Sequence, residues 1–214
     1  MTLDAPWPRR GEIWDCGLGQ VAVHDLYLEP LPGFMRADCI FVDPPYNAAL
    51  ESNYRHRVGL PRSPGYKGFL DRLFRTIGVI APRTCFVEIG AQNVGEISRR
   101  LAAHGFARID CFKATYYWRH PCYVVRGSAG PPPIRYDDCD ESEIVALICE
   151  HEEFTVIADP CMGKGLVGRC AFAQRRRFCG TELNPGRLGA LIASIAEQGG
   201  SWNVSRGEPA GSQS

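Results

Sequence analysis

The sequence lacks the features that would place the chain in a membrane or in an oxidising compartment. Its longest apolar runs are far too short to span a bilayer, and residues 1–10 carry prolines and charges where a secretion signal has an apolar core. We therefore expect a cytoplasmic protein with no membrane partner. No two of the ten cysteines form a C-x-x-C pair, and none stands at zinc-finger spacing from a histidine. This predicts reduced thiols, no disulfide framework and no metal.

The chain also lacks an excess of charge of one sign. It has 24 basic and 24 acidic residues, so its formal net charge is zero. This balance argues against a protein held on nucleic acid by bulk positive charge, although a local basic patch is still possible. Candidates for such a patch are Arg55, His56, Arg57 and Arg62 in one cluster and Arg175, Arg176 and Arg177 in another. The second cluster is also ordinary for a helix C-terminus.

The hydrophobic pattern alternates between strands and helices. It predicts seven strands, at 20–25, 38–43, 84–90, 108–118, 121–127, 154–159 and 177–182. It predicts helices at 66–80, 93–104, 140–150, 166–174 and 185–197. This order is typical of an α/β fold with a mostly parallel seven-stranded sheet covered by helices. Strands 108–118 and 121–127 would form an antiparallel hairpin around Arg119, His120 and Pro121.

Residues 1–198 are expected to form a single domain, with one half at 20–128 and the other at 140–198. Residues 47–66 show no clear period, and we expect them to form a long loop. The polar, Gly/Ser-rich segment 199–214 is expected to be disordered.

A glycine-rich turn follows the predicted strand 154–159. The strand ends at Asp159, and Pro160-Cys161-Met162-Gly163-Lys164-Gly165 follows, where glycines let the backbone approach a ligand at the start of a helix. The next strand ends at Glu182, where a carboxylate can accept both hydrogen bonds of a ribose diol. The turn lacks a full G-x-G-x-x-G and, because Leu166 follows Gly165, the G-K-[ST] of a P-loop. The pattern predicts nucleotide-like binding, although such a turn can also merely join two elements.

In the first half, a buried strand stops abruptly at Asp43-Pro44-Pro45-Tyr46. The two prolines fix φ and remove two backbone donors, so their carbonyls stay free as acceptors. The Asp43 carboxylate and the flat Tyr46 ring complete a cup that accepts hydrogen bonds from an amino group and stacks on an aromatic ring. The alternative interpretation is a rigid turn with an exposed tyrosine.

These segments resemble a known family. Residues 43–47 (Asp-Pro-Pro-Tyr-Asn) resemble the catalytic motif of the amino-methyltransferases that modify N6 of adenine or N4 of cytosine in DNA. Residues 159–165 resemble their methyl-donor motif, and residues 180–187 resemble the strand-end acid and helix start that follow it. The catalytic motif precedes the donor motif, which is the circularly permuted order of the beta group of this family. The resemblance covers 20–197 and implies a Rossmann-like fold, S-adenosylmethionine as cofactor and DNA as partner.

The resemblance implies a role for each matching residue. Asp43 and the Pro44 carbonyl, with Pro45 beside them, would hold the target amino group, and Tyr46 would stack on the flipped base. Residues expected to bind the donor are Asp25, Asp159, Pro160, Cys161, Gly163, Lys164, Gly165, Glu182, Leu183 and Asn184. Residues expected to contact nucleic acid are Asn47, Arg55, Arg57, Arg62, Trp118, Arg119 and His120. For Trp118 a role in the core is an equal alternative.

The chain departs from the family in two places. The family's donor motif commonly reads Asp-Pro-Phe-x-Gly-Ser-Gly-Thr, and here Cys161, Lys164 and Leu166 stand at the Phe, Ser and Thr positions. Lys164 could instead pair with the donor carboxylate. Larger members also insert a target-recognition region before the donor half, where this chain has only 129–139. We therefore expect loop 47–66 to supply much of the nucleic-acid contact.

The aspartate before Pro-Pro-Tyr favours adenine within the family. We expect a DNA adenine-N6 methyltransferase that transfers the methyl group directly to a flipped-out base, with neither a metal nor a covalent enzyme intermediate. Alternatives are methylation of cytosine N4, methylation of an amino group on RNA or protein, and a catalytically silent nucleic-acid-binding subunit. Dimers are common in the family, so a homodimer is a further alternative. The sequence leaves open whether the protein is the partner of a restriction enzyme, an orphan methyltransferase or a phage-borne regulator.

Overall fold

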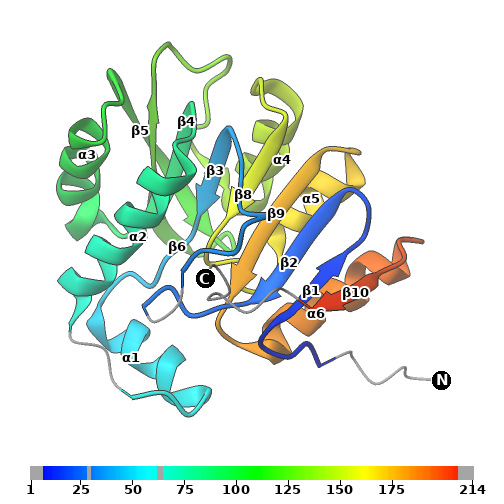
Figure 1. Ribbon diagram of the computed structural model, residues 1–214. Coiled ribbons are helices and arrows are strands. Elements are labelled where there is room, and N and C mark those ends of the chain that lie inside the picture. Colours follow the sequence, from blue (N-terminus) through cyan, green and yellow to red (C-terminus); the bar gives the residue numbers. More distant parts are fainter. Residues whose placement is uncertain (1–6, 28–29, 62–64, 207–214) are drawn as a thin grey trace, which may run out of the picture.

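The computed structural model describes residues 7–27, 30–61 and 65–206. These residues form one mixed sheet with helices on both faces (Figure 1). All seven predicted strands are present: β2 (Gly19–Val23), β3 (Cys39–Val42), β4 (Thr84–Ile89), β5 (Arg108–Tyr116), β6 (His120–Ser128), β8 (Val156–Asp159) and β9 (Arg177–Glu182).

The sheet has ten strands rather than the seven predicted. The additional strands are β1 (Glu12–Asp15), β7 (Cys139–Asp140) and β10 (Asn203–Arg206). They are two to four residues long, and every β10 side chain is exposed. Strands this short contain too few apolar side chains to show an alternation, so the sequence pattern could not reveal them.

The strand order is β10-β1-β2-β9-β8-β3-β4-β6-β5-β7. Strands β2, β9, β8, β3 and β4 run parallel, whereas β6 pairs antiparallel with both β4 and β5. This confirms the mostly parallel sheet with an antiparallel hairpin. From β3 the chain continues to β4 on one side, and from β8 it continues to β9 on the other. Ligands of such sheets bind beyond the carboxyl ends of the strands at this switch point.

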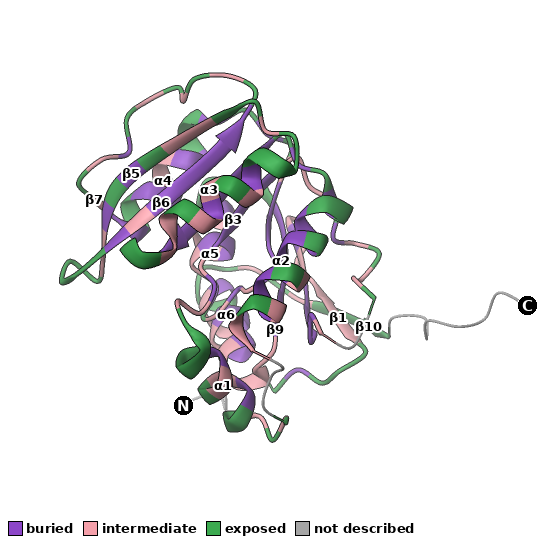
Figure 2. Cartoon of the chain, turned by 90° about the vertical axis from the view of Figure 1, so that its left-hand side faces the viewer, coloured by how far each residue is buried: buried purple, intermediate pink, exposed green. Residues whose placement is uncertain are grey.

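Five predicted helices cover the two faces. α2 (Tyr66–Ile80) and α3 (Val94–Ala103) pack on one face, and α4 (Glu141–His151), α5 (Leu166–Ala173) and α6 (Pro185–Glu197) pack on the other. Figure 2 shows buried residues along the central strands and exposed residues on the outer sides of α2 and α3. Among the described residues, no helix combines the length and the apolar character that crossing a membrane requires.

Within the segment 47–66, which was expected to be a long loop, residues 48–57 form a helix, and residues 62–64 lie outside the described part of the chain. Asn47 caps a helix, α1 (Ala48–Arg57), by accepting a hydrogen bond from the backbone N–H of Leu50 at 3.0 Å. Glu51 and Arg55 are the buried residues of α1, so the helix has no apolar stripe for sequence periodicity to detect.

Part of the expected disordered tail is a strand. β10 pairs antiparallel with β1, and Trp202 just before it donates a hydrogen bond from Nε1 to the Ile192 carbonyl at 3.1 Å. The Trp202 ring meets the Trp14 ring edge-on at 6.5 Å between centroids. Aromatic packing therefore fixes this segment despite its polar composition, and residues 207–214 lie outside the described part of the chain.

The hairpin loop consists of Tyr117, Trp118 and Arg119, because Tyr116 already pairs with His120 and Thr115 with Pro121. Of the three residues expected at the turn, only Arg119 lies in it. Tyr117 has φ 51° and Trp118 has φ 56°, in the left-handed region that residues other than glycine seldom adopt. Hairpin turns with positive φ at two successive positions normally contain Asn or Gly there. Two aromatic residues gave no such signal in the sequence.

A buried ion pair joins the hairpin to the end of α4. Arg126 on β6 donates from Nε to Oε1 of Glu152 at 2.9 Å and from Nη2 to Oε2 at 3.2 Å. The Tyr136 hydroxyl donates to the same carboxylate at 3.1 Å. Arg126 is 3% exposed and Glu152 7%. Removing one partner would therefore leave a buried charge uncompensated.

We expect Arg126→Met to lower the free energy of unfolding by about 3–5 kcal/mol, measured by denaturant titration. The double variant Arg126→Met/Glu152→Met should recover most of this loss, because no unpaired charge remains. Arg135→Met removes an exposed ion pair with Asp137 and should cost less than about 1 kcal/mol. Equal losses in the single and double variants would contradict this interpretation.

Candidate active site

A cavity of about 960 Å³ lies at the carboxyl ends of the central strands. It is lined both by the motif that follows β3 and by the glycine turn that follows β8. The predicted site residues that line it are Asp25, Asp43, Pro44, Pro45, Tyr46, Arg55, Trp118, His120, Asp159, Pro160, Cys161, Gly163, Lys164, Glu182 and Leu183. Asn47, Arg57, Arg119, Gly165 and Asn184 are not among the lining residues. Arg62 lies outside the described residues.

A hydrogen bond to Asp159 and two glycines with positive φ determine the conformation of the glycine turn. Asp159 accepts a hydrogen bond from the Cys161 N–H at 2.9 Å. Gly163 and Gly165 have φ of 55° and 79°, which glycine adopts without strain. A Cβ atom on Gly165 would lie 2.5 Å from Leu191 Cδ1. Gly165 therefore lets α5 begin close to α6, and Gly163 is the glycine of the turn that borders the cavity.

Glu182, at the end of β9, bonds to the glycine turn. Its Oε2 accepts the Gly163 N–H at 2.6 Å, and its Oε1 accepts the Asn184 N–H at 2.8 Å. Burial raises the pKa of Glu182, and the nearby Arg187 guanidinium lowers it. Each carboxylate oxygen can accept a second hydrogen bond, so the group can still hold a diol.

Arg187 is a cavity residue for which the sequence analysis proposed no role. Its guanidinium lies over the Tyr54 ring, 5.1 Å from the centroid, and a Cβ atom on Gly163 would be 2.9 Å from its Nη2. Among the described residues, its Nε has no hydrogen-bond partner. A cation with an unused donor beside the glycine turn is suited to a carboxylate on a ligand.

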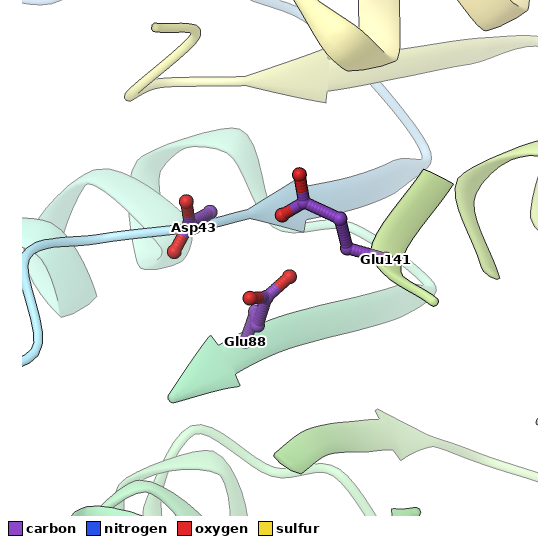
Figure 3. Close-up of side chains that lie close together, drawn as sticks. All are labelled: Asp43, Glu88 and Glu141. Atoms are coloured by element: carbon purple, nitrogen blue, oxygen red, sulfur yellow. The ribbon is translucent and has the colours of Figure 1, made fainter. Parts of the chain in front are cut away.

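Three carboxylates gather at the other end of the cavity, and their side chains point toward one another (Figure 3). They come from the tip of β3 (Asp43), from β4 (Glu88) and from the start of α4 (Glu141), and one oxygen of each lies within 4.8 Å of the others. Asp43 and Glu141 line the cavity, whereas Glu88 is fully buried behind them. The prediction of a metal-free site stays a prediction, because such a set can also hold a divalent cation.

Two hydrogen bonds hold Tyr46 in place, one at its side-chain hydroxyl and one at its backbone carbonyl. Its hydroxyl donates a hydrogen bond to Glu88, and its backbone carbonyl accepts one from Asn93 Nδ2 at 2.7 Å. The ring lines the cavity and is half-buried. Glu88 was missed by the sequence analysis, although an acid inside the otherwise apolar strand 84–90 was a usable signal.

The three carboxylates hold protons more tightly than isolated acids do. Burial, and then repulsion from Glu141, raises the pKa of Asp43 to about 7. Burial and the Asp43 charge raise the pKa of Glu88 to about 9, and burial with Asp140 raises that of Glu141 to about 7. At neutral pH the cluster therefore carries at least one proton, which Glu88 holds most strongly.

Arg55 does not face solvent as expected of a nucleic-acid contact. It is 4% exposed, and its Nη1 lies 3.1 Å from Asp25 Oδ1 while its Nε donates to the Pro61 carbonyl at 2.8 Å. Asp25 lines the cavity, and its predicted role in donor binding stays a prediction. Arg57, on the same helix, is exposed. The expected basic surface at Arg55 is therefore corrected to an internal ion pair with Asp25.

The hairpin turn places aromatic side chains at the rim of the cavity. Tyr117 and Trp118 are 60% and 64% exposed, and both line the cavity together with His120. The backbone N–H of Trp118 donates to Asp140 Oδ2 at 2.7 Å, which fixes the strained turn. This exposure excludes the core role that the sequence left as an alternative for Trp118.

Comparison with solved structures identifies the fold. M1.HpyAVI superposes with a TM-score of 0.59 at 12% identity over 83% of this chain and 99% of that chain. TTHA0409, a putative DNA modification methylase of Thermus thermophilus complexed with S-adenosyl-L-methionine, superposes with a TM-score of 0.58. Its sequence identity is 15%, and the match covers 83% of this chain and 93% of that chain. PvuII DNA methyltransferase (cytosine-N4-specific) superposes with a TM-score of 0.57 at 11% sequence identity, over 84% of this chain and 86% of that chain. The chain has a DNA methyltransferase fold. No family model and no curated protein sequence matches it.

Within this methyltransferase fold, the acidic cluster predicts a pH dependence of stability. Because the pKa values of Asp43, Glu88 and Glu141 are higher in the folded chain, the stability they contribute is present below about pH 4 and is lost as pH rises through about 7 and 9. One such group contributes a slope of at most about 1.4 kcal/mol per pH unit.

We expect Glu88→Gln to flatten the fall in the free energy of unfolding between pH 6 and 9, roughly the range of these pKa values. Denaturant titrations in EDTA measure this slope without bound cations. Glu150→Gln, an exposed substitution on α4, is the matched control and should leave the slope unchanged. If the free energy of unfolding fell with pH equally steeply in Glu88→Gln and in the wild type, Glu88 would not be the group that holds the proton of the cluster.

Proposed function

We propose that the chain is an S-adenosylmethionine-dependent DNA methyltransferase that acts on N6 of adenine. One observation carries the proposal: Asp43-Pro44-Pro45-Tyr46 and the glycine turn at Gly163 line the same cavity. The likeness in fold to a modification methylase solved with S-adenosyl-L-methionine supports both the cofactor and the reaction.

The cavity fits the proposed donor. Its volume is at the upper end of the range for ligand pockets, which leaves room for a nucleoside and a flipped base. Glu182 at a strand tip suits the ribose diol, and the cationic side chains of Lys164 and Arg187 suit the donor carboxylate. When bound, S-adenosylmethionine supplies a methyl group on a positively charged sulfur, ready for direct displacement.

The residues of the motif prepare the nucleophile. The lone pair of an exocyclic amino group is delocalised into the base, so the nitrogen is a weak nucleophile. Hydrogen bonds from its two N–H groups to the Asp43 carboxylate and the Pro44 carbonyl localise this lone pair on nitrogen. Tyr46, held by its hydrogen bond to Glu88, offers its ring for stacking on the base. Catalysis would then come from placing the amino nitrogen in line with the methyl group, and the proton that this nitrogen loses on methylation would pass along its hydrogen bond to the Asp43 carboxylate.

The choice of adenine rests on the aspartate at the first position of the motif. Cytosine N4 is the second candidate, because one structure of the same fold is a cytosine-N4-specific enzyme. Both bases present an amino group beside a ring nitrogen, so the same cup could accept either one.

DNA would approach from the rim of the cavity. A base inside a duplex cannot reach Asp43, so the target nucleotide has to leave the stack. Tyr117 and Trp118 stand at the rim, where exposed aromatic rings can stack on an unpaired base. Two exposed cations, Arg57 on α1 and Arg119 in the hairpin loop, are the candidates for phosphate contacts.

We expect Asp43→Asn to lower the single-turnover rate of methyl transfer by about 10²–10³-fold, because a neutral amide accepts hydrogen bonds more weakly than a carboxylate. Transfer of a labelled methyl group to duplex DNA measures the rate, and calorimetry checks that donor affinity is unchanged. Asp71→Asn, on exposed α2 surface, is the control and should keep full activity. Full activity in Asp43→Asn would refute the assigned role.

Trp118→Ala should weaken the binding of DNA that carries a mismatched target base by about 10–100-fold, from the loss of one stacking partner. Fluorescence anisotropy measures the affinity. Trp7→Ala removes another exposed tryptophan, one that does not line the cavity, and should leave DNA affinity unchanged. Equal effects of the two substitutions would remove the hairpin turn from the DNA-binding surface.

A further inference from the structure

Helix α1 directs a charged side chain without hydrogen bonds into the cavity. Glu51 is 2% exposed and lines the cavity, and among the described residues neither of its carboxylate oxygens has a hydrogen-bond partner. Its ion-pair contact is with Arg55 Nε at 3.9 Å, which is too long for a hydrogen bond. The hydrogen bonds of Arg55 go to Pro61 and Asp25 instead.

A buried carboxylate without hydrogen bonds is costly, and folded proteins seldom keep one without a use. The same wall of the cavity holds a second free acceptor, because Asp25 Oδ2 also has no partner among the described residues. Asp25 and Glu51 are therefore two acidic groups with unused lone pairs that line one cavity. A ligand with hydrogen-bond donors would satisfy both.

The position of Glu51 indicates which part of a ligand it meets. Tyr54 follows three residues later on α1, so its side chain lies on the same face of the helix as that of Glu51. The Tyr54 ring packs against Arg187, whose guanidinium borders Gly163. The Gly163 N–H in turn bonds to Glu182. Glu51 therefore projects from α1 toward the part of the cavity that Glu182 borders from the sheet.

We propose that Glu51 binds the sugar hydroxyls of the donor nucleoside from α1, while Glu182 binds them from the tip of β9. Both oxygens of Glu182 already accept backbone N–H groups, whereas those of Glu51 are entirely free. The proposal rests on S-adenosylmethionine as the donor. It makes the face of α1 that carries Glu51 one wall of the donor site, whereas the exposed Arg57 at the end of the same helix stays a candidate for phosphate contact.

Glu51→Gln tests the proposal in the full chain. The Kd for S-adenosylmethionine, measured by calorimetry, should rise by about 10–100-fold, because a neutral amide oxygen accepts hydrogen bonds more weakly than a carboxylate and offers one acceptor atom instead of two. Without ligand, the variant should melt at the same temperature as the wild type or higher, because a buried charge without hydrogen bonds is removed. Glu197→Gln, exposed on α6, is the matched control and should change neither quantity.

Nucleoside competitors identify the group that Glu51 binds. Adenosine should displace the donor from the wild type at least about 10-fold better than 2′-deoxyadenosine or 3′-deoxyadenosine, and Glu51→Gln should lose most of this preference. Equal preference in the two proteins would overturn the assignment to the sugar. A lower melting temperature with unchanged donor affinity would show a structural role instead. Stabilisation of the wild type, but not of the variant, by Mg²⁺ alone would show a cation site.

The outcomes also separate this inference from the function on which it rests. If the wild type binds S-adenosylmethionine and Glu51→Gln binds it equally well, only the role of Glu51 is wrong. If the wild type binds neither S-adenosylmethionine nor adenosine, both proposals are wrong.

Discussion

The pairing of β3 with β8 is the constraint on which the rest of the site depends. Cys39 lies opposite Ile157 and Ile40 opposite Ala158, in parallel register, although these residues come from different halves of the chain. The register places the ends of both strands at one edge of the sheet, where Asp159 is the last residue of β8 and Asp43 directly follows β3. The chain leaves this edge in opposite directions, which opens the cavity between the two motifs.

The cavity is rich in buried acids, and this composition links function to stability. Asp43, Glu88 and Glu141 repel one another at one end, and Glu51 stays without hydrogen bonds along one wall. Such groups destabilise the empty protein and favour ligands that bring positive charge or hydrogen-bond donors. A sulfonium donor and an exocyclic amino group have these properties, so the electrostatics and the motifs support the same chemistry.

The sequence predicted the parts of the molecule that hydrophobic patterns and local motifs determine. Phe69, Leu70 and Leu73 recur at helical spacing, which predicted α2. The glycine turn after Asp159 showed that a strand ends there. Helix α1 was missed because its buried residues are Glu51 and Arg55, which pair within the cavity instead of forming an apolar stripe. No local pattern shows that Arg55 bonds to Asp25, since this contact forms only when distant segments meet.

We propose that the motif after β3 and the glycine turn after β8 together form one site for methyl transfer to a DNA base. Mass spectrometry of nucleosides from duplex DNA, incubated with the protein and S-adenosylmethionine deuterated at the methyl group, tests it most directly. We expect N6-methyladenine carrying three deuterium atoms, in amounts that grow with the time of incubation and with the concentration of protein. Donor binding shown by calorimetry, together with no deuterated nucleoside from any DNA supplied, would contradict it.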